Sequence, residues 1–173
     1  VHHRDGGVDM KYYKFIDENN RGYNGFDYTE YLPRDGQPGK PLPTVEGKIE
    51  PCECGYHACK PQFVSHWINA QLYEVELSGN LVDAEDKTAA SDMRFIRKVD
   101  AWNERAQRLF AVLCARGALK LVDNPDPRCI AACDVAERYA NGAATDGELS
   151  AACLAARDAA AAANGAWAAN GAA

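Results

Sequence analysis

The sequence predicts an α+β protein: a small, strongly curved antiparallel sheet followed by a C-terminal helical segment. In residues 11–99, short runs rich in aromatic and β-branched residues alternate with Gly, Pro, Asn and Asp, as in a sheet of antiparallel strands. From Asp100 onward, apolar residues recur every three or four positions, as on one face of a helix. The length of 173 residues and an apolar content of 47% are sufficient for one core.

The strands are expected where the β-favouring runs occur. In the run LYEVEL, residues 72–77, alternation places Glu74 and Glu76 on one side of the strand, opposite Val75 and its apolar neighbours. A turn is expected at residues 78–80, which read Ser-Gly-Asn. The predicted strands are residues 11–16, 26–32, 48–52, 56–58, 72–77 and 93–99, the last with Met93 and Phe95 directed inward.

A long loop is expected between the second and third of these runs. Residues 33–47 contain four prolines and three glycines, a composition that cannot maintain a helix or a ladder of strand hydrogen bonds. Loops of this length are often functional or mobile. Both a lid over a site and an ordinary surface connection are compatible with this composition.

Helix-start and helix-stop residues delimit the helical segments. Pro61 suits the first turn of a short helix, because its missing N–H would have no helical partner there. Asp100 is expected to cap a helix that ends at Gly117. Thr145 is followed three residues later by Glu148, which is the pattern of a capping box. The predicted long helices are residues 101–116 and 128–140, and an alanine-rich helix that follows Thr145.

The chain is expected to have three parts: a flexible N-terminal extension at 1–10, an α+β domain at 11–122 and an alanine-rich helical appendage at 123–173. Alanine has the highest helix propensity but little surface to bury, and Trp167 is the one large aromatic residue of the last helix. This helix can provide a contact for a protein partner or a second copy of the chain. The alternative is an ordinary surface helix.

Charge and cysteine content restrict the class of protein. A net charge of −6 disfavours broad attraction to nucleic acid or anionic membranes. Two alternatives apply to Arg94, Arg97 and Lys98: they are solvated charges at a strand edge, or they form a small basic groove. No run approaches the roughly 20 apolar residues that span a bilayer, and residues 1–10 contain no apolar signal core. The cysteines are seven, an odd number, so reduced thiols and a cytoplasmic location are expected.

Cys52, Cys54, His57 and Cys59 concentrate potential zinc ligands within eight residues. Zinc binds four such groups tetrahedrally, but the spacing C-x-C-x2-H-x-C lacks the paired C-x2-C units of common structural sites. Zinc binding is therefore a minor alternative. The main interpretation is that Cys52 and Cys59 are small residues of the core. Neither the residues around the cysteines nor the chain length favours a thiol protease.

Polar residues on adjacent predicted strands suggest a nucleotide-type site. The chain contains neither the phosphate-loop motif nor the G-x-G-x-x-G dinucleotide motif. Aromatic, basic and carboxylate groups on neighbouring strands can nevertheless hold a nicotinamide ribose and stabilise a developing oxocarbenium charge. Solvated strand faces would have the same sequence pattern. The residues concerned are Lys14, Tyr56, His57, Glu74, Glu76 and the acidic turn at residues 83–86.

One block of residues resembles a known but uncharacterised family of phage and actinobacterial proteins. It begins with Gly-Tyr-His-Ala-Cys at residues 55–59, matching G-[FY]-H-A-C, and continues with Trp67, the strand at 72–76, Gly79 and Lys87. The resemblance extends over residues 11–119. It implies a phage-encoded or related protein and brings no established activity.

A weaker resemblance is to small ADP-ribosyltransferases of the rifamycin-modifying kind. It rests on a Tyr/His strand, the run LYEVEL with a following glycine, an acidic turn, and an Arg-containing strand before Trp102. One departure concerns Lys14, since the transferases carry His or Arg on the first strand. Lys14 therefore stands where the family has its ribose-binding group, and a fold can be shared where the chemistry is lost.

This second resemblance implies an ADP-ribosyltransferase-like protein that binds NAD or a related nucleotide. Tyr56 would stack on nicotinamide, and Lys14 or His57 would hold the ribose. Glu76 or Asp83 would stabilise the oxocarbenium-like centre or orient the acceptor. This interpretation requires Lys14, His57 and Glu76 to open onto a common cleft. The alternative is a non-enzymatic phage or host-interaction protein that binds its partner through the proline-rich loop or the alanine-rich helix.

Overall fold

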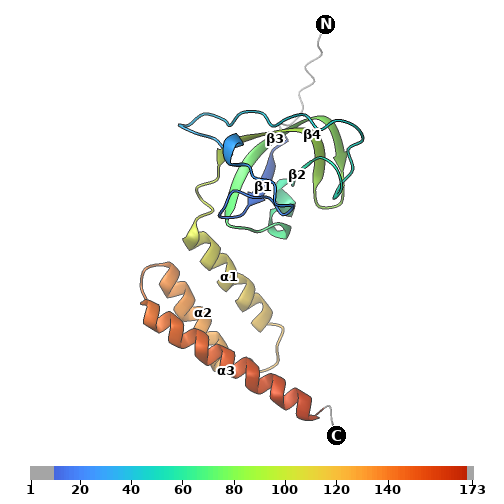
Figure 1. The fold of residues 1–173 in the computed structure, drawn as a ribbon. Coiled ribbons are helices and arrows are strands. Elements are labelled where there is room, and N and C mark those ends of the chain that lie inside the picture. The colour runs from blue at the N-terminus through green and yellow to red at the C-terminus, as the bar shows by residue number, and fades with distance from the viewer. Residues whose placement is uncertain (1–9, 171–173) are drawn as a thin grey trace. The chain divides into compact units, whose positions relative to one another are not determined.

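The computed structural model describes residues 10–170, with side chains to residue 163, and contains the expected α+β arrangement (Figure 1). Four antiparallel strands form one sheet in the order β1-β3-β4-β2. The sheet curls into a half-barrel, and three α-helices follow it in the chain. The strands are β1 (Tyr12–Ile16), β2 (Tyr56–Ala58), β3 (Gln71–Asp83) and β4 (Thr88–Lys98).

The curl brings the two edge strands of the sheet together. Tyr13 of β1 and Cys59, directly after β2, exchange two backbone N–H···O hydrogen bonds of 2.8 Å each. No further backbone pairing joins β1 and β2 in the part of the chain described. The two edges of the half-barrel are therefore joined at a single point.

The expected turn at residues 78–80 is wrong: these residues lie within β3, where the register against β4 shifts between Ser78 and Leu81. Gly79 has φ +75°, and a Cβ there would lie 2.0 Å from Ser91 Oγ, so glycine permits a bulge instead of a turn. The chain reverses later, where the Ala84 N–H donates to the Lys87 carbonyl at 2.8 Å.

The core lies on the concave side of the sheet and is centred on β4. Met93 and Phe95 are 2% and 0% exposed, as predicted, and Ile16 of β1 is fully buried with them. The rings of Tyr28 and Tyr73 meet Phe95 edge-on at centroid distances of 5.2 and 5.3 Å. These contacts join β1, β3, β4 and the loop that follows β1 into one apolar cluster.

The predicted strand at 26–32 is wrong. This segment contains a short 3-10 helix, η1 (Thr29–Tyr31), because Asp27 Oδ1 accepts the Thr29 N–H at 2.9 Å and begins a local turn. The predicted strand at 48–52 is wrong as well. Only Glu50 pairs there, in an isolated bridge with Cys54, and Cys52 adopts φ +71°, which no strand allows.

The proline-rich loop at 33–47 forms no regular element, as expected, but it is attached to β4 along much of its length. The N–H groups of Gly39, Leu42 and Val45 donate to carbonyls of β4 at 2.9, 3.0 and 2.9 Å. The three acceptors are every second residue of the strand: Phe95, Met93 and Ser91. Leu42 is 4% exposed. The loop is thus a fixed part of the sheet's surroundings.

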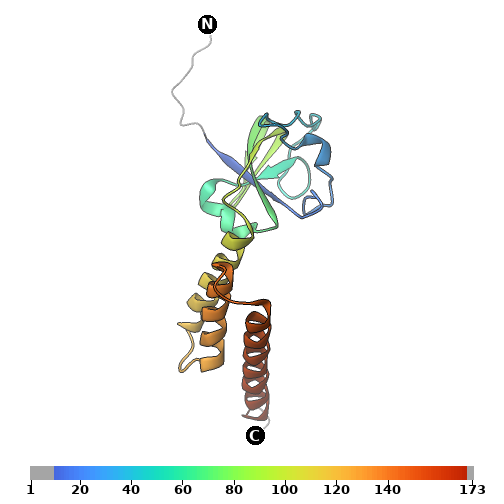
Figure 2. The same cartoon turned by 90° about the vertical axis from the view of Figure 1, so that its left-hand side faces the viewer.

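Pro61 begins a helical segment as predicted, although it is the 3-10 helix η2 (Pro61–His66) and not an α-helix. The long helices are α1 (Glu104–Leu119), α2 (Pro127–Ala140) and α3 (Asp146–Asn170). The helix α2 contacts both α1 and α3 (Figure 2). None of the described helices is both long and apolar enough to cross a membrane.

The ends of the helices confirm one cap and correct two. Thr145 and Glu148 form the predicted capping box, with reciprocal hydrogen bonds of 2.8 and 3.2 Å between side chain and backbone N–H. The cap of α1 is Asn103, whose Oδ1 accepts the Ala106 N–H at 3.1 Å, and not Asp100. Gly117 does not stop α1, which continues to Leu119.

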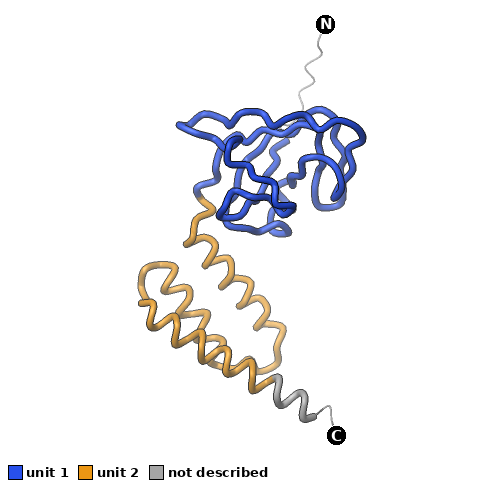
Figure 3. Tube along the Cα trace, in the orientation of Figure 1, with its two compact units in different colours: residues 1–100 blue, residues 101–173 orange. Residues whose placement is uncertain are grey.

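The chain divides into two compact units, residues 1–100 and 101–173 (Figure 3). The sequence-based boundary after residue 122 lies inside the second unit, since α1 contacts α2. Residues 1–9 of the expected flexible extension lie outside the described residues, as does the side chain of Trp167.

We expect Gly39→Ala to destabilise the first unit by at least about 2 kcal/mol. A Cβ at Gly39 would lie 1.8 Å from the Tyr31 carbonyl oxygen, a backbone atom of the last residue of η1. Gly36→Ala is the control: nothing lies within 4 Å of its Cβ position, so only the strain of φ +73° remains, about 1 kcal/mol. Urea denaturation measures both variants, and an equal loss of stability would contradict this assignment.

Candidate functional site

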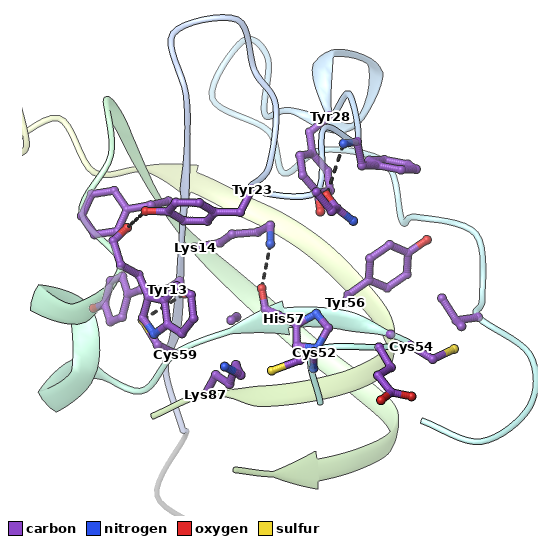
Figure 4. A pocket seen from close by; sticks show the side chains of 18 residues that line it. Tyr13, Lys14, Tyr23, Tyr28, Cys52, Cys54, Tyr56, His57, Cys59 and Lys87 are labelled. Carbon is purple, nitrogen blue, oxygen red and sulfur yellow. Dashed lines mark hydrogen bonds between the residues drawn. The ribbon is translucent and has the colours of Figure 1, made fainter. Parts of the chain in front are cut away.

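A cavity of about 540 Å³ lies in the first unit, where the edges of β1 and β2 meet (Figure 4). It is lined by residues of both strands, by the loop after β1 and by the turn before β2. This volume is typical of small-molecule sites. The aromatic part of its lining includes Tyr13, Tyr23, Phe26, Tyr28, Tyr56 and Trp67.

Lys14 of β1 directs its ammonium group towards β2 (Figure 4). Its Nζ donates to the His57 carbonyl oxygen at 2.8 Å and lies 5.1 Å from the centre of the Tyr28 ring. Burial lowers the pKa of Lys14 to about 8, and the thiol of Cys59 opposes this only in part. Among the described residues, no carboxylate lies within ion-pair distance of this ammonium group.

His57 of β2 is held in its neutral form. Its Nε2 accepts the backbone N–H of Cys52 at 2.9 Å, so its own proton is assigned to Nδ1. Burial lowers the pKa of His57, and the ammonium groups of Lys14 and Lys87 lower it further. The left-handed backbone of Cys52, with φ +71°, belongs to the turn that makes this contact.

The aromatic lining is fixed by contacts among its members. Tyr23 and Trp67 meet edge-on with ring centroids 5.8 Å apart, and the Tyr23 hydroxyl donates to the Trp67 carbonyl at 3.0 Å. The ammonium of Lys87 lies 4.6 Å from the centre of the Trp67 ring. The hydroxyl of Tyr56 donates to the carbonyl of Pro43 at 2.7 Å, which ties the proline-rich loop to the cavity wall.

The two expected catalytic carboxylates lie elsewhere. Glu76 is exposed on β3 opposite Arg94 and does not line the cavity, so Lys14 and His57 share a cleft that Glu76 does not. Asp83, at the end of β3, pairs with Lys60 at 2.9 Å and accepts the Thr88 hydroxyl at 2.5 Å. These two hydrogen bonds lower the pKa of Asp83. The carboxylate that does line the cavity is Glu53.

The cysteines of the first unit occupy different environments. Cys59 is 2% exposed, its thiol donates to the Tyr13 carbonyl at 3.4 Å, and burial raises its pKa to about 11, so it is the core residue that the sequence suggested. Cys52 is exposed instead of buried, and Cys54 is partly exposed. Within the described residues, no group of three or more His, Cys, Asp or Glu side chains is arranged to hold a metal ion.

Three residues predicted from the sequence, Lys14, Tyr56 and His57, lie in one cavity. The aromatic residues of the loop after β1 were not predicted, and neither was Lys87, whose ammonium faces Trp67. A signal for the former was present. Tyr23 stands in a segment of Gly and Asn that forms turns, where a large aromatic side chain has no role in a regular element.

Residues 10–106, more than half of the chain, match a family model described as "Domain of unknown function (DUF7666)". The chain therefore belongs to this family, which agrees with the expected membership of an uncharacterised domain family. Neither the curated proteins nor the solved structures contain a match to the chain.

We expect the stability of the protein to depend on pH through Lys14. Its pKa is about 8 in the folded protein and 10.5 ordinarily, so the unfolded chain binds more protons between these values. The stability of the wild type relative to Lys14→Met should therefore rise from pH 8 to pH 10.5, by up to about 3 kcal/mol. Urea denaturation of both proteins across this range measures the difference, and a constant difference would contradict a lowered pKa.

Proposed function

We propose that the first unit binds a planar, anionic ligand of the nucleotide class, with NAD as the first candidate, in the cavity between β1 and β2. The observation that carries this proposal is the ammonium group of Lys14, which lies in an aromatic cavity and has no carboxylate partner within the described part of the chain. Lys14, Tyr56 and His57 would be the binding residues.

The physical argument begins with the cost of the isolated charge. Burying an ammonium group without a counter-charge is unfavourable, as the lowered pKa of Lys14 reflects. An anionic group of a ligand would supply the missing counter-charge and raise that pKa again. The aromatic side chains around the ammonium offer flat apolar faces, on which a nicotinamide or a purine can stack.

The arrangement supports binding of a nucleotide more directly than transfer of ADP-ribose. In an ADP-ribosyltransferase-like mechanism, a carboxylate near the ribose stabilises the oxocarbenium-like centre or orients the acceptor. Glu76 and Asp83 lie outside the cavity, so neither supplies this group from its observed position. The resemblance to rifamycin-type transferases is the reason to test NAD first. In this proposal Tyr56 would stack on the nicotinamide, and Lys14 would contact the ribose and its phosphates.

Calorimetry with NAD, ADP-ribose and AMP tests the proposal on the full chain. We expect binding by the wild type and at least a tenfold loss of affinity in Lys14→Met, since a charge-assisted contact contributes about 1.5–3 kcal/mol. Lys11→Met is the matched control: this lysine precedes the same strand, is exposed, and should bind as the wild type does. Absence of binding for all three ligands, or equal binding by Lys14→Met, would refute the proposal.

A second measurement separates binding from turnover. We expect Glu76→Gln and Asp83→Asn to bind NAD with unchanged affinity, because neither side chain reaches the cavity. We also expect the protein to release nicotinamide from NAD no faster than buffer alone does. Chromatography of the NAD mixture measures this rate. Release that is abolished by Glu76→Gln would show transferase chemistry and would overturn this part of the proposal. Loss of affinity in both carboxylate variants would place the ligand outside the cavity.

A further inference from the structure

We propose that Lys14 is a nucleophilic amine, which forms a Schiff base with a planar aldehyde that carries an anionic group and enters the same cavity. This goes beyond nucleotide binding, because it assigns a covalent reaction to a residue so far treated as a binding cation.

The first support is the geometry around Lys14 Nζ. Among the described residues, this nitrogen has a single hydrogen-bond acceptor, the His57 carbonyl oxygen at 2.8 Å. An ammonium has three N–H groups and an amine has two, so loss of one proton leaves the bond to His57 in place. The lone pair that appears is then available to a ligand in the cavity that Lys14 lines.

The second support is the surroundings, which favour the neutral amine. No carboxylate pairs with Lys14 among the described residues, and its neighbours are the Tyr28 ring, the neutral His57 and the buried thiol of Cys59. Desolvation of this kind is how reactive lysines are activated. With a pKa of about 8, roughly one-tenth of Lys14 is neutral at pH 7, some 300 times the fraction of an ordinary lysine.

The reaction balances without an oxidant or a metal. The amine lone pair attacks the carbonyl carbon, a C–N bond forms, and the C=O pair moves to oxygen. The two amine hydrogens leave with that oxygen as water, and an imine remains on Lys14 Nζ. No other co-reactant is needed, and the reverse reaction with water regenerates the free amine.

The cavity also indicates which aldehydes fit. Its aromatic lining favours a planar ring, and Lys87, whose ammonium lies 4.6 Å from the Trp67 ring centre, provides a second cation for an anionic substituent. Asp86 Oδ1 lies 3.5 Å from Lys87 Nζ and offsets part of this charge. A phosphate and a carboxylate share the chemistry required, so both are included as probes.

Reductive trapping on the full-length protein tests the proposal. The protein is incubated near pH 7.5 with a slight excess of pyridoxal 5′-phosphate, 4-carboxybenzaldehyde or neutral benzaldehyde, reduced with cyanoborohydride and digested for mass spectrometry. We expect Lys14 to be labelled at least ten times faster than Lys11 and Lys48 in the same wild-type molecule, and faster by the two anionic aldehydes than by benzaldehyde. Thiol adducts at Cys52 or Cys54 are not reduced to stable products, so they do not interfere.

Lys14→Arg should lose the fast label, whereas Lys11→Arg should keep it. Because the comparison with Lys11 and Lys48 is made within the wild type, the result does not depend on the folding of any variant. If Lys14 is labelled no faster than Lys11, the proposal is overturned. If benzaldehyde labels Lys14 as fast as the anionic aldehydes do, the assignment of an anionic ligand is overturned. This outcome is independent of NAD binding, which calorimetry decides separately.

Discussion

The first unit depends on one closure, the pair of backbone hydrogen bonds between Tyr13 and Cys59. They join the two edges of the curled four-stranded sheet at one point. The bridge is made by Cys59, directly after the three-residue strand β2, and among the described residues the backbone pairing with β1 does not extend into β2. One residue further along β1, the side chain of Lys14 makes the next connection, to the carbonyl of His57.

This arrangement explains why a cavity exists and why it contains a charge. Where a backbone ladder ends, the strand edges separate, and side chains and loops must complete the wall. The loop after β1 supplies Tyr23 and Phe26, and η2 is followed by Trp67. The connection made by Lys14 carries a partly buried ammonium into this wall. A carbonyl and an aromatic ring hold that charge less well than a carboxylate would, which is the physical basis for inferring an anionic ligand.

The outcome for the expected site residues follows from their positions along the strands. Lys14, Tyr56 and His57 lie on the two edge strands that meet, so they share the cavity. Glu76 alternates along β3 with Val75 and Leu77, which are 3% and 8% exposed and face the core. Its carboxylate therefore faces away from the core, and the period of two residues along a strand was sufficient to deduce this from the sequence.

The sequence alone determined the features that depend on neighbouring residues: the α+β order of elements, the extended run of β1, the long irregular loop and the capping box at Thr145. Each is a local preference of the chain, and local preferences are visible in a short window. Only the tertiary structure decided that the turn after residue 77 is a bulge, that Cys52 bonds His57, and that β1 meets β2. The bulge and the meeting of β1 with β2 depend on contacts between residues distant in sequence, whose register no local pattern specifies. The Cys52–His57 bond spans only five residues, but it requires a left-handed backbone at Cys52 that the residue type does not indicate.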